Sequence, residues 1–244
     1  GNIYVTGFFQ GTAQFGDYSV SSLGGFDMFL VKYNPEGEVL WATSMGGPML
    51  VYGVSLDIDA ELNVYVVGYF MGSLQTDVGT FSAGGVRDVY LAGFNAQGEL
   101  QWVRTAGSPS IDQGQGIAVD AHHGRVYITG SYIGVMTFPG SGVQLSGGAG
   151  DDLFVAAYDL DGNFLWARGG IGPENNLGFE LGTDAQGNIY GVGTFTANAT
   201  FGSIQLQSSG DLDILTFKLD PEGNWLWARA FGGTLPETAW DISV

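Results

Sequence analysis

Residues 27–41, DMFLVKYNPEGEVLW, decide the fold because the chain repeats this pattern three more times. The other copies are DVYLAGFNAQGELQW from Asp88, DLFVAAYDLDGNFLW from Asp152 and DILTFKLDPEGNWLW from Asp213. In all four copies a Gly lies ten residues after the Asp, and a Trp follows four residues after that Gly. Identical spacing in four copies predicts one structural unit that is used four times.

A second motif precedes each copy of the first. It has a Tyr, a Gly three residues later and an aromatic residue two positions after the Gly, as in Tyr4, Gly7 and Phe9. The later copies begin at Tyr65, Tyr127 and Tyr190, and the period of the whole pattern is 61 to 64 residues. We therefore treat residues 1–244 as a single domain with repeats of approximately 1–62, 63–124, 125–187 and 188–244.

Each repeat predicts four β-strands, termed A to D. Strand A is expected at 52–59, with copies at 114–120, 178–184 and 239–244, while strand B carries the Tyr and strands C and D carry the Asp and the Trp. Turns such as NPEG between strands C and D are typical of hairpins, and helical periodicity is absent. Radially repeated, antiparallel units of this length predict an all-β fold: a β-propeller with four blades of four antiparallel strands.

The order of the strands predicts how the ring closes. The sequence starts at a strand B and stops at a strand A, so residues 239–244 are expected to pair with the N-terminal strand and complete one blade. Such pairing would cover two exposed sheet edges. A fragment of a larger propeller is the alternative. The Trp of strand D is expected to pack between blades, where burial of a large aromatic side chain stabilises the fold most.

The first repeat also resembles a known family. NIYVTGFFQGTAQFG, followed by GGFDMFLVKYNPEGEVLWATSMGG, resembles the bacterial propeller repeat labelled SBBP, and the resemblance covers nearly the whole chain. This family is common in large secreted and surface proteins, notably of Bacteroidetes. The resemblance implies a propeller in an extracellular or cell-surface setting, and it implies no reaction. The second repeat departs most, because its LQTDVGTF lacks the Phe-Gly pair seen at 15–16. The sequence therefore does not decide whether this repeat forms a small hairpin between its strands B and C.

The composition excludes several classes of protein. Seven Lys and Arg against 25 Asp and Glu give a formal net charge of -18, which repels nucleic acids and anionic membranes. The chain has no Cys and two adjacent His, so disulfides, thiolate metal sites and His-based catalytic triads are excluded. No run of about 18 apolar residues is present, so no membrane-spanning helix is expected.

The candidate ligand site lies in the B–C and D–A loops, because loops that vary on a rigid scaffold commonly carry function. One loop position directly before strand A is polar in three of the four repeats, where it would bind a cation or a sugar hydroxyl, or cap the strand end. With two neighbouring side chains added, the candidate ligand-binding residues are Asp112, Asn176, Glu237, Glu174 and Tyr52.

Two further acidic motifs are expected to be structural. The Asp that opens each strand C has the same spacing in every repeat, so each carboxylate is expected to accept backbone N–H groups at a bend. The DLDG at 159–162 resembles part of a calcium loop but lacks the remaining ligands, and turn chemistry is the preferred interpretation. No cofactor is expected, and a structural cation such as calcium is the lesser alternative.

Three functions fit these observations. The first is a non-catalytic binding or adhesion module with a protein or carbohydrate ligand, as a monomer or as part of a larger bacterial surface protein. The second is a structural spacer in a surface assembly. The third is an enzyme acting on glycans through two carboxylates among Asp112, Glu174 and Glu237. No spacing singles out a pair of these carboxylates, so the first function is preferred.

Overall fold

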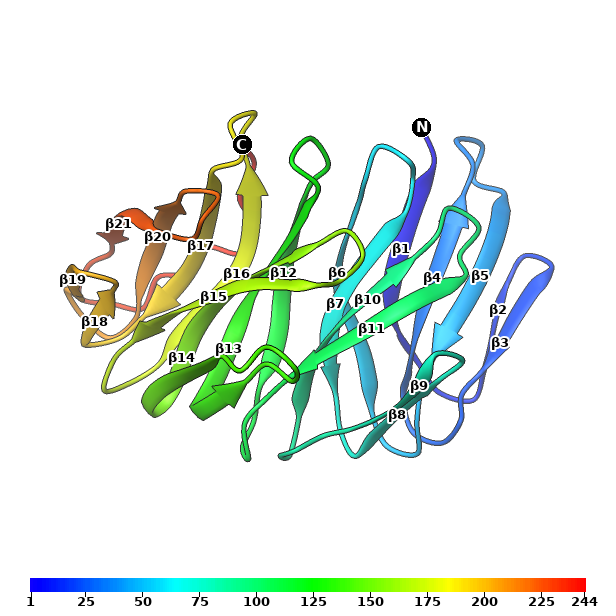
Figure 1. Cartoon of the computed structure of the whole chain (residues 1–244), viewed down its shortest axis with the longest axis horizontal. Helices are drawn as coiled ribbons and strands as arrows, with labels where there is room; N and C mark the ends of the chain where they lie inside the picture. The colour runs from blue at the N-terminus through cyan, green and yellow to red at the C-terminus, as the bar shows by residue number, and fades with distance from the viewer.

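The repeats fold into four antiparallel sheets that stand side by side (Figure 1). The computed structural model describes residues 1–244 and contains strands, turns and loops without a helix. Blade 1 consists of β1 (Ile3–Phe9), β4 (Asp27–Tyr33) and β5 (Val39–Met45). Blade 2 consists of β6 (Val51–Ile58), β7 (Val64–Phe70), β10 (Asp88–Phe94) and β11 (Leu100–Ala106). Blade 3 consists of β12 (Gln113–Asp120), β13 (Arg125–Thr137), β14 (Gln144–Asp159) and β15 (Phe164–Ile171). Blade 4 consists of β16 (Asn176–Thr183), β17 (Ile189–Phe195), β20 (Asp213–Leu219) and β21 (Trp225–Phe231).

A small hairpin lies between strands B and C in three blades. The hairpins are β2 (Thr12–Phe15) with β3 (Tyr18–Ser21), β8 (Ser73–Thr76) with β9 (Gly79–Ser82), and β18 (Asn198–Phe201) with β19 (Ile204–Gln207). The second repeat therefore does form this hairpin, with Gly79 at a φ of 148° in its turn, although it lacks the Phe-Gly pair. In blade 3 the two long strands β13 and β14 extend into the same region instead.

The predicted propeller architecture is present in its coarse form, but the predicted ring closure is wrong. β1 pairs only with β4, and residues 239–244 form no strand. These residues lie instead against β16, where Trp240 packs on Phe179 with ring centroids 4.7 Å apart and 30° between the planes. The physical reason is the position of the blades: blades 1 and 4 lie at opposite ends of the row, so the two predicted partners do not meet (Figure 1).

The hydrophobic core lies between the blades rather than inside one sheet. Three clusters of buried side chains fill the three interfaces: Met28 and Val66 belong to the one between blades 1 and 2, Val89 and Ile128 to the next, and residues such as Leu153 to the last. This explains why strand C is apolar on both faces: β10 is buried along its whole length. The row of blades also curves. Its curvature brings the inner strands of blades 2 and 4 together across β12, where the Ser55 hydroxyl on β6 lies 3.3 Å from the Glu180 carboxylate on β16.

The Trp of strand D joins consecutive blades, as predicted. The Trp41 indole N–H donates to the carbonyl of Ala96 at 3.2 Å, in the C–D turn of blade 2. Trp102 and Trp166 donate in the same way to the C–D turns of blades 3 and 4, at 3.2 and 3.0 Å. Each of these indoles also covers the turn Gly of the next blade, so that a Cβ at Gly98 would lie 2.8 Å from the Trp41 ring.

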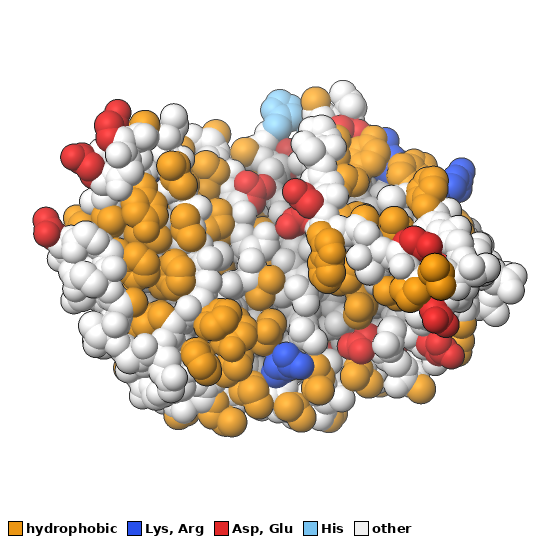
Figure 2. All heavy atoms as spheres, turned by 180° about the vertical axis from the view of Figure 1, so that it is seen from behind, with side chains coloured by type: hydrophobic (Ala, Val, Ile, Leu, Met, Phe, Trp, Pro, Cys, Tyr) orange, Lys and Arg blue, Asp and Glu red, His pale blue; other side chains and the backbone are white.

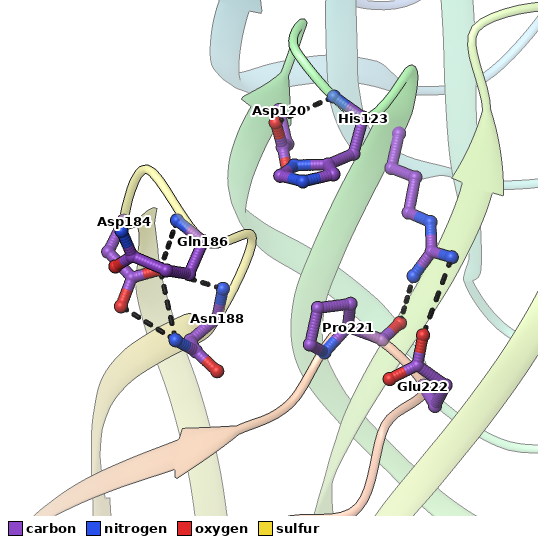
Figure 3. A network of polar contacts seen from close by, with 8 residues as sticks. Asp120, His123, Asp184, Gln186, Asn188, Pro221 and Glu222 are labelled. Atoms are coloured by element: carbon purple, nitrogen blue, oxygen red, sulfur yellow. Dashed lines mark hydrogen bonds and ion pairs between the residues drawn. The ribbon is translucent and has the colours of Figure 1, made fainter.

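On the opposite side from the B–C and D–A loops, short turns are capped by acidic and amide side chains. The Asp184 carboxylate accepts N–H groups of Gln186 and Asn188, and the Asp120 carboxylate lies 2.6 Å from His123 Nδ1 (Figure 3). The turn of Asp159 is built alike: Asp159 accepts the N–H of Asn163 at 2.7 Å, so the preferred interpretation of DLDG as a turn is confirmed.

No helix long and apolar enough to cross a membrane is present.

Candidate functional site

The four Asp residues that open strand C hold the loops on one face of the molecule. They are nearly fully buried, and each accepts at least one backbone N–H from the loop that precedes it. Asp27 bridges two loops, since it accepts the N–H of Leu23 at 2.7 Å and that of Gly47 at 3.1 Å. A Cβ at Gly46 would overlap the Asp27 carboxylate, which explains the Gly at this position. The structural role predicted for these residues is confirmed.

Asp112 and Asn176, two of the predicted ligand-binding residues, are fully buried in their own loops. Asp112 Oδ2 accepts the backbone N–H of Ser108 at 2.6 Å and lies 3.0 Å from the Ser108 hydroxyl, while Asp112 Oδ1 has no partner. Burial raises the pKa of Asp112 to about 6. Asn176 donates its amide to the Asp152 carboxylate at 3.3 Å and to the Glu174 carbonyl at 3.2 Å. Both side chains therefore hold loop structure in this state of the molecule.

The structure separates the remaining predicted residues. The Glu237 carboxylate accepts the N–H of Gly233 at 2.9 Å, which is the same capping contact that Asp112 makes two repeats earlier. The Glu174 side chain is exposed on a loop. The side chain of Tyr52 is half-buried and belongs to a different group, described next. The structure thus distributes the predicted set over three loops and does not gather it into one site; its ligand binding stays a prediction.

An aromatic cluster with one cation lies on the loop face of blades 1 and 2. We define the aromatic cluster as Phe8, Phe26, Tyr52, Tyr69 and Arg87. Phe8 stacks on Tyr52 with ring centroids 3.9 Å apart and 14° between the planes. Phe26 meets Phe8 edge-on at 5.6 Å, and Tyr69 lies 5.4 Å from Tyr52. Phe8 is 49% exposed and Phe26 is 38% exposed, so the rings present apolar surface to solvent.

Arg87 is the cation of the aromatic cluster. Its guanidinium lies 5.0 Å from the centre of the Tyr69 ring and forms no ion pair. Burial raises the pKa of Tyr69 and the Arg87 charge partly offsets that effect, so the tyrosine stays neutral at physiological pH. An unpaired, half-buried guanidinium in a chain of net charge -18 is a site for an anionic group. In the view from behind Figure 1, hydrophobic side chains gather on the half that holds blades 1 and 2 (Figure 2).

The aromatic cluster breaks the symmetry of the repeats. The positions equivalent to Phe8 in blades 3 and 4 are Ser131 and Thr194, and those equivalent to Phe26 are Asp151 and Leu212. In blade 3 these positions are polar partners, since the Ser131 hydroxyl lies 3.3 Å from Asp151. Four of the five cluster residues were not predicted from the sequence, because the candidate residues were chosen for polar side chains in the loops. A comparison of the strand ends across the four copies would have found them.

Three cavities lie on the outer side, between consecutive blades. One of about 610 Å³ lies between blades 2 and 3 and is lined by Phe138, Tyr158, Phe164 and Arg104. Its Arg104 guanidinium is already bound to the Gly162 carbonyl at 2.7 Å. Related cavities of about 550 and 430 Å³ occupy the corresponding places between the other blades. Cavities that recur at each interface belong to the architecture, and we do not assign them as the site.

Two half-buried carboxylates lie on the concave side, and both cap strand β12. Asp57 accepts the N–H of Val119 at 2.7 Å, and Glu180 accepts the N–H of Ile117 at 3.0 Å. Burial raises the pKa of Asp57 and of Glu180. These contacts satisfy N–H groups on the free edge of an inner strand, which otherwise attracts other strands. No group of three or more His, Cys, Asp or Glu that could hold a metal ion is present in residues 1–244.

Comparison with known proteins gives partial similarities. No family model matches the chain. The uncharacterized WD repeat-containing protein L264 of Acanthamoeba polyphaga mimivirus is 26% identical over 187 residues, which are 68% of this chain and 13% of that protein. The regulatory protein FlaEY of Caulobacter vibrioides is 30% identical over 145 residues, 57% of this chain and 15% of that protein. The chain thus spans less than a sixth of these relatives. BamB from Moraxella catarrhalis matches 90% of this chain and 81% of its own, with 10% identity and a TM-score of 0.24.

Proposed function

We propose that this chain is a non-catalytic interaction module that binds a protein or carbohydrate ligand on its loop face. The observation that carries the proposal is the aromatic cluster, in which two partly exposed Phe rings pack with two Tyr rings, one of which lies against an unpaired Arg87. Exposed apolar patches of this kind mark interaction surfaces, and aromatic residues with Arg dominate binding energy at interfaces. Its restriction to blades 1 and 2 supports a role other than architecture.

The composition of the aromatic cluster indicates the chemistry of the ligand. One face of the Phe8 ring is covered by Tyr52 and Phe26 packs against the same ring, which leaves the rest of Phe8, a residue that is 49% exposed, open to a ligand. An apolar ring face packs on the C–H face of a sugar or on a proline ring. Arg87 adds a donor for a carboxylate, in a molecule whose other charges would repel an anion. The ligand that fits best is therefore a peptide or saccharide that combines an apolar face with an acidic group.

A non-catalytic role is supported by the state of the carboxylates. Of the three that a glycan-active enzyme would use, Asp112 and Glu237 are bound to their own loops, and Glu174 lies on an exposed loop. The spacer function is the second candidate, and the repeated interfaces between the blades favour it. The resemblance of the repeat to the SBBP family supports a setting in a secreted or cell-surface bacterial protein, which stays a proposal.

A binding screen followed by matched substitutions tests the proposal. The purified chain is screened on a glycan array and against a peptide library, and affinities for the hits are measured by calorimetry. Phe8→Ala and Arg87→Ala are expected to weaken binding at least tenfold, because each removes a central contact. Leu165→Ala, at a 43% exposed position of blade 3, is the control and is expected to leave affinity unchanged. Ligands that bind Phe8→Ala and Arg87→Ala as tightly as the unmodified chain would contradict the assignment of the site. Absence of any hit, together with a role in assembly, would favour the spacer.

A further inference from the structure

The cavity of about 610 Å³ between blades 2 and 3 differs in its lining from the cavities at the other two interfaces. Seven of its fourteen lining residues are hydrophobic, compared with four of fourteen and two of nine in the cavities of about 550 and 430 Å³. The place of the three cavities is therefore architectural, but the apolar lining belongs to this one. Cavities of this size that combine apolar walls with a few polar groups are typical of small-molecule sites.

Aromatic side chains form much of the wall of this cavity. The ring of Phe164 on β15 lies 5.1 Å from that of Phe138 and 5.6 Å from that of Tyr158, measured between centroids. Phe138 and Tyr158 are each 3% exposed and belong to the core between blades 2 and 3, so the surrounding core holds both rings in place. Phe81, from the hairpin of blade 2, lines the same cavity. Walls of this kind favour a planar aromatic ligand, which can pack against the rings face-on or edge-on.

The Tyr158 hydroxyl supplies a polar group that the fold does not use. It lines the cavity and has no hydrogen-bond partner in the chain, and it is not enclosed as the hydroxyls of Tyr127 and Tyr132 are. Blades 2 and 4 carry Phe94 and Leu219 at the equivalent position of strand C, so the blade architecture does not require a hydroxyl here. Burial raises the pKa of Tyr158, which keeps the hydroxyl neutral and able to donate. The cavity therefore offers one free donor to a ligand, beside aromatic walls.

The charges around the cavity favour a neutral ligand. Arg104 is the one cation in its lining. The Arg104 guanidinium already donates to the carbonyls of Gly162 at 2.7 Å and Asp161 at 3.3 Å, and to that of Val103 at 3.0 Å. The rest of a chain with a net charge of -18 repels an anion. No carboxylate lines the cavity, so a cationic ligand would lack a partner as well.

We propose that the cavity between blades 2 and 3 binds a neutral aromatic molecule of one or two rings that carries a hydrogen-bond acceptor, as an aryl ketone does. The ligand ring packs on Phe138 and Phe164, and its acceptor takes the hydrogen bond that Tyr158 leaves unmade. The residues that line the site lie between positions 81 and 165, and both blades that form it contain all four strands. The cavity is separate from the aromatic cluster on the loop face, so it would give the interaction module a second site, for a small molecule.

Titration with 4-fluoroacetophenone, followed by fluorine NMR, tests the proposal. Saturable binding with a dissociation constant below about 1 mM is expected for a ligand of this size. Tyr158→Phe removes only the hydroxyl and is expected to weaken binding about fivefold, the usual effect of one hydrogen bond. Phe164→Leu introduces the residue that blade 2 has at position 100 and is expected to weaken binding at least threefold, because the ring contact is lost. Tyr33→Phe is the matched control, since it makes the same change at the equivalent position of blade 1, outside this cavity, and should leave affinity unchanged.

Two comparisons define the site and the class of ligand. The anion 4-fluorobenzoate has the same ring and is expected to bind at least tenfold more weakly than the ketone. Phe8→Ala, in the aromatic cluster, is expected to leave affinity for 4-fluoroacetophenone unchanged, so this proposal and the loop-face function can fail independently. The proposal is overturned if the dissociation constant of the unmodified chain exceeds about 1 mM. It is also overturned if Tyr158→Phe binds the ketone as tightly as Tyr33→Phe does, or if ketone and benzoate bind equally well.

Discussion

The buried carboxyl group of Asp112 destabilises the fold when it is ionised, so replacement by an amide should stabilise the protein. Asp112 is fully buried, and its Oδ1 has no hydrogen-bond partner. Burial raises its pKa from an ordinary value of 3.8 to about 6. The folded state therefore holds the Asp112 proton more tightly than the unfolded state does. The free energy of unfolding falls as pH rises from 3.8 to about 6, and the full loss of stability applies above pH 6. At about 1.36 kcal/mol per pKa unit, the penalty is about 3 kcal/mol.

Asp112→Asn should therefore raise the free energy of unfolding by up to about 3 kcal/mol at pH 7, and by less than about 1 kcal/mol at pH 4. The amide oxygen can keep the bonds to Ser108. Blade 4 already carries Asn at the equivalent position, where Asn176 donates to Asp152. The reverse change, Asn176→Asp, is the matched control: it places a carboxylate beside Asp152 and should destabilise the fold at pH 7 more than at pH 4.

Urea unfolding followed by circular dichroism at several pH values between 4 and 8 gives these free energies. The diagnostic quantity is the difference between the variant and the unmodified chain as a function of pH. A gain for Asp112→Asn that is the same at all pH values would refute the electrostatic explanation. A loss at pH 7 would show that the carboxylate makes a favourable contact that the amide cannot replace, and it would refute the reasoning as well.

Two further predictions concern the contacts between blades. Trp102→Ala should destabilise the protein by about 3 kcal/mol in the same assay, because it removes an indole that bonds to Leu160 and covers the turn Gly of blade 3; a loss below about 1 kcal/mol would contradict interblade packing. Gly98→Ala should cost at least about 1 kcal/mol more than Gly37→Ala in the monomeric chain. Both glycines have a φ of 80–85°, so the backbone strain is alike, but only the Cβ at position 98 meets an indole. Equal costs at the two positions would mean that the Trp41 ring moves aside freely.

The sequence predicted the strands because the repeats supply four independent records of the same unit. Residues that recur at fixed spacing, such as Asp27 and Trp41, have the structural roles that were expected. Ring closure was predicted from the order of strands alone, and it was wrong because order does not fix the angle between neighbouring blades. That angle depends on how side chains pack in each interface, as Trp102 does against the next turn, and on contacts such as Trp240 with Phe179.

The candidate site was harder to predict for a related reason. Acidic loop residues were selected for their chemistry, yet buried loops need acceptors for their own N–H groups, and Asp112 serves that need. Phe8 and Phe26 lie at strand ends, where an aromatic residue in a single repeat resembles any core residue. Their significance emerges only when the rings are seen to meet Tyr52 across two blades, with centroid distances of 3.9 Å for Phe8 and 6.1 Å for Phe26.

The few cations connect these conclusions. A chain with a net charge of -18 has only seven Lys and Arg, and four of them make contacts between blades: Lys32, Arg104, Arg125 and Arg168. Lys218 pairs with Asp184 within blade 4. Two cations remain without a partner in another blade or a carboxylate, Arg87 on the loop face and Arg229 at the end of the row. Where cations are scarce and otherwise used for joining, an unused one indicates a surface that joins something else. Arg87, beside Tyr69 on the loop face, is then assigned to the ligand. Arg87→Ala should weaken ligand binding, while Arg229→Ala, on a different surface, should leave ligand affinity unchanged.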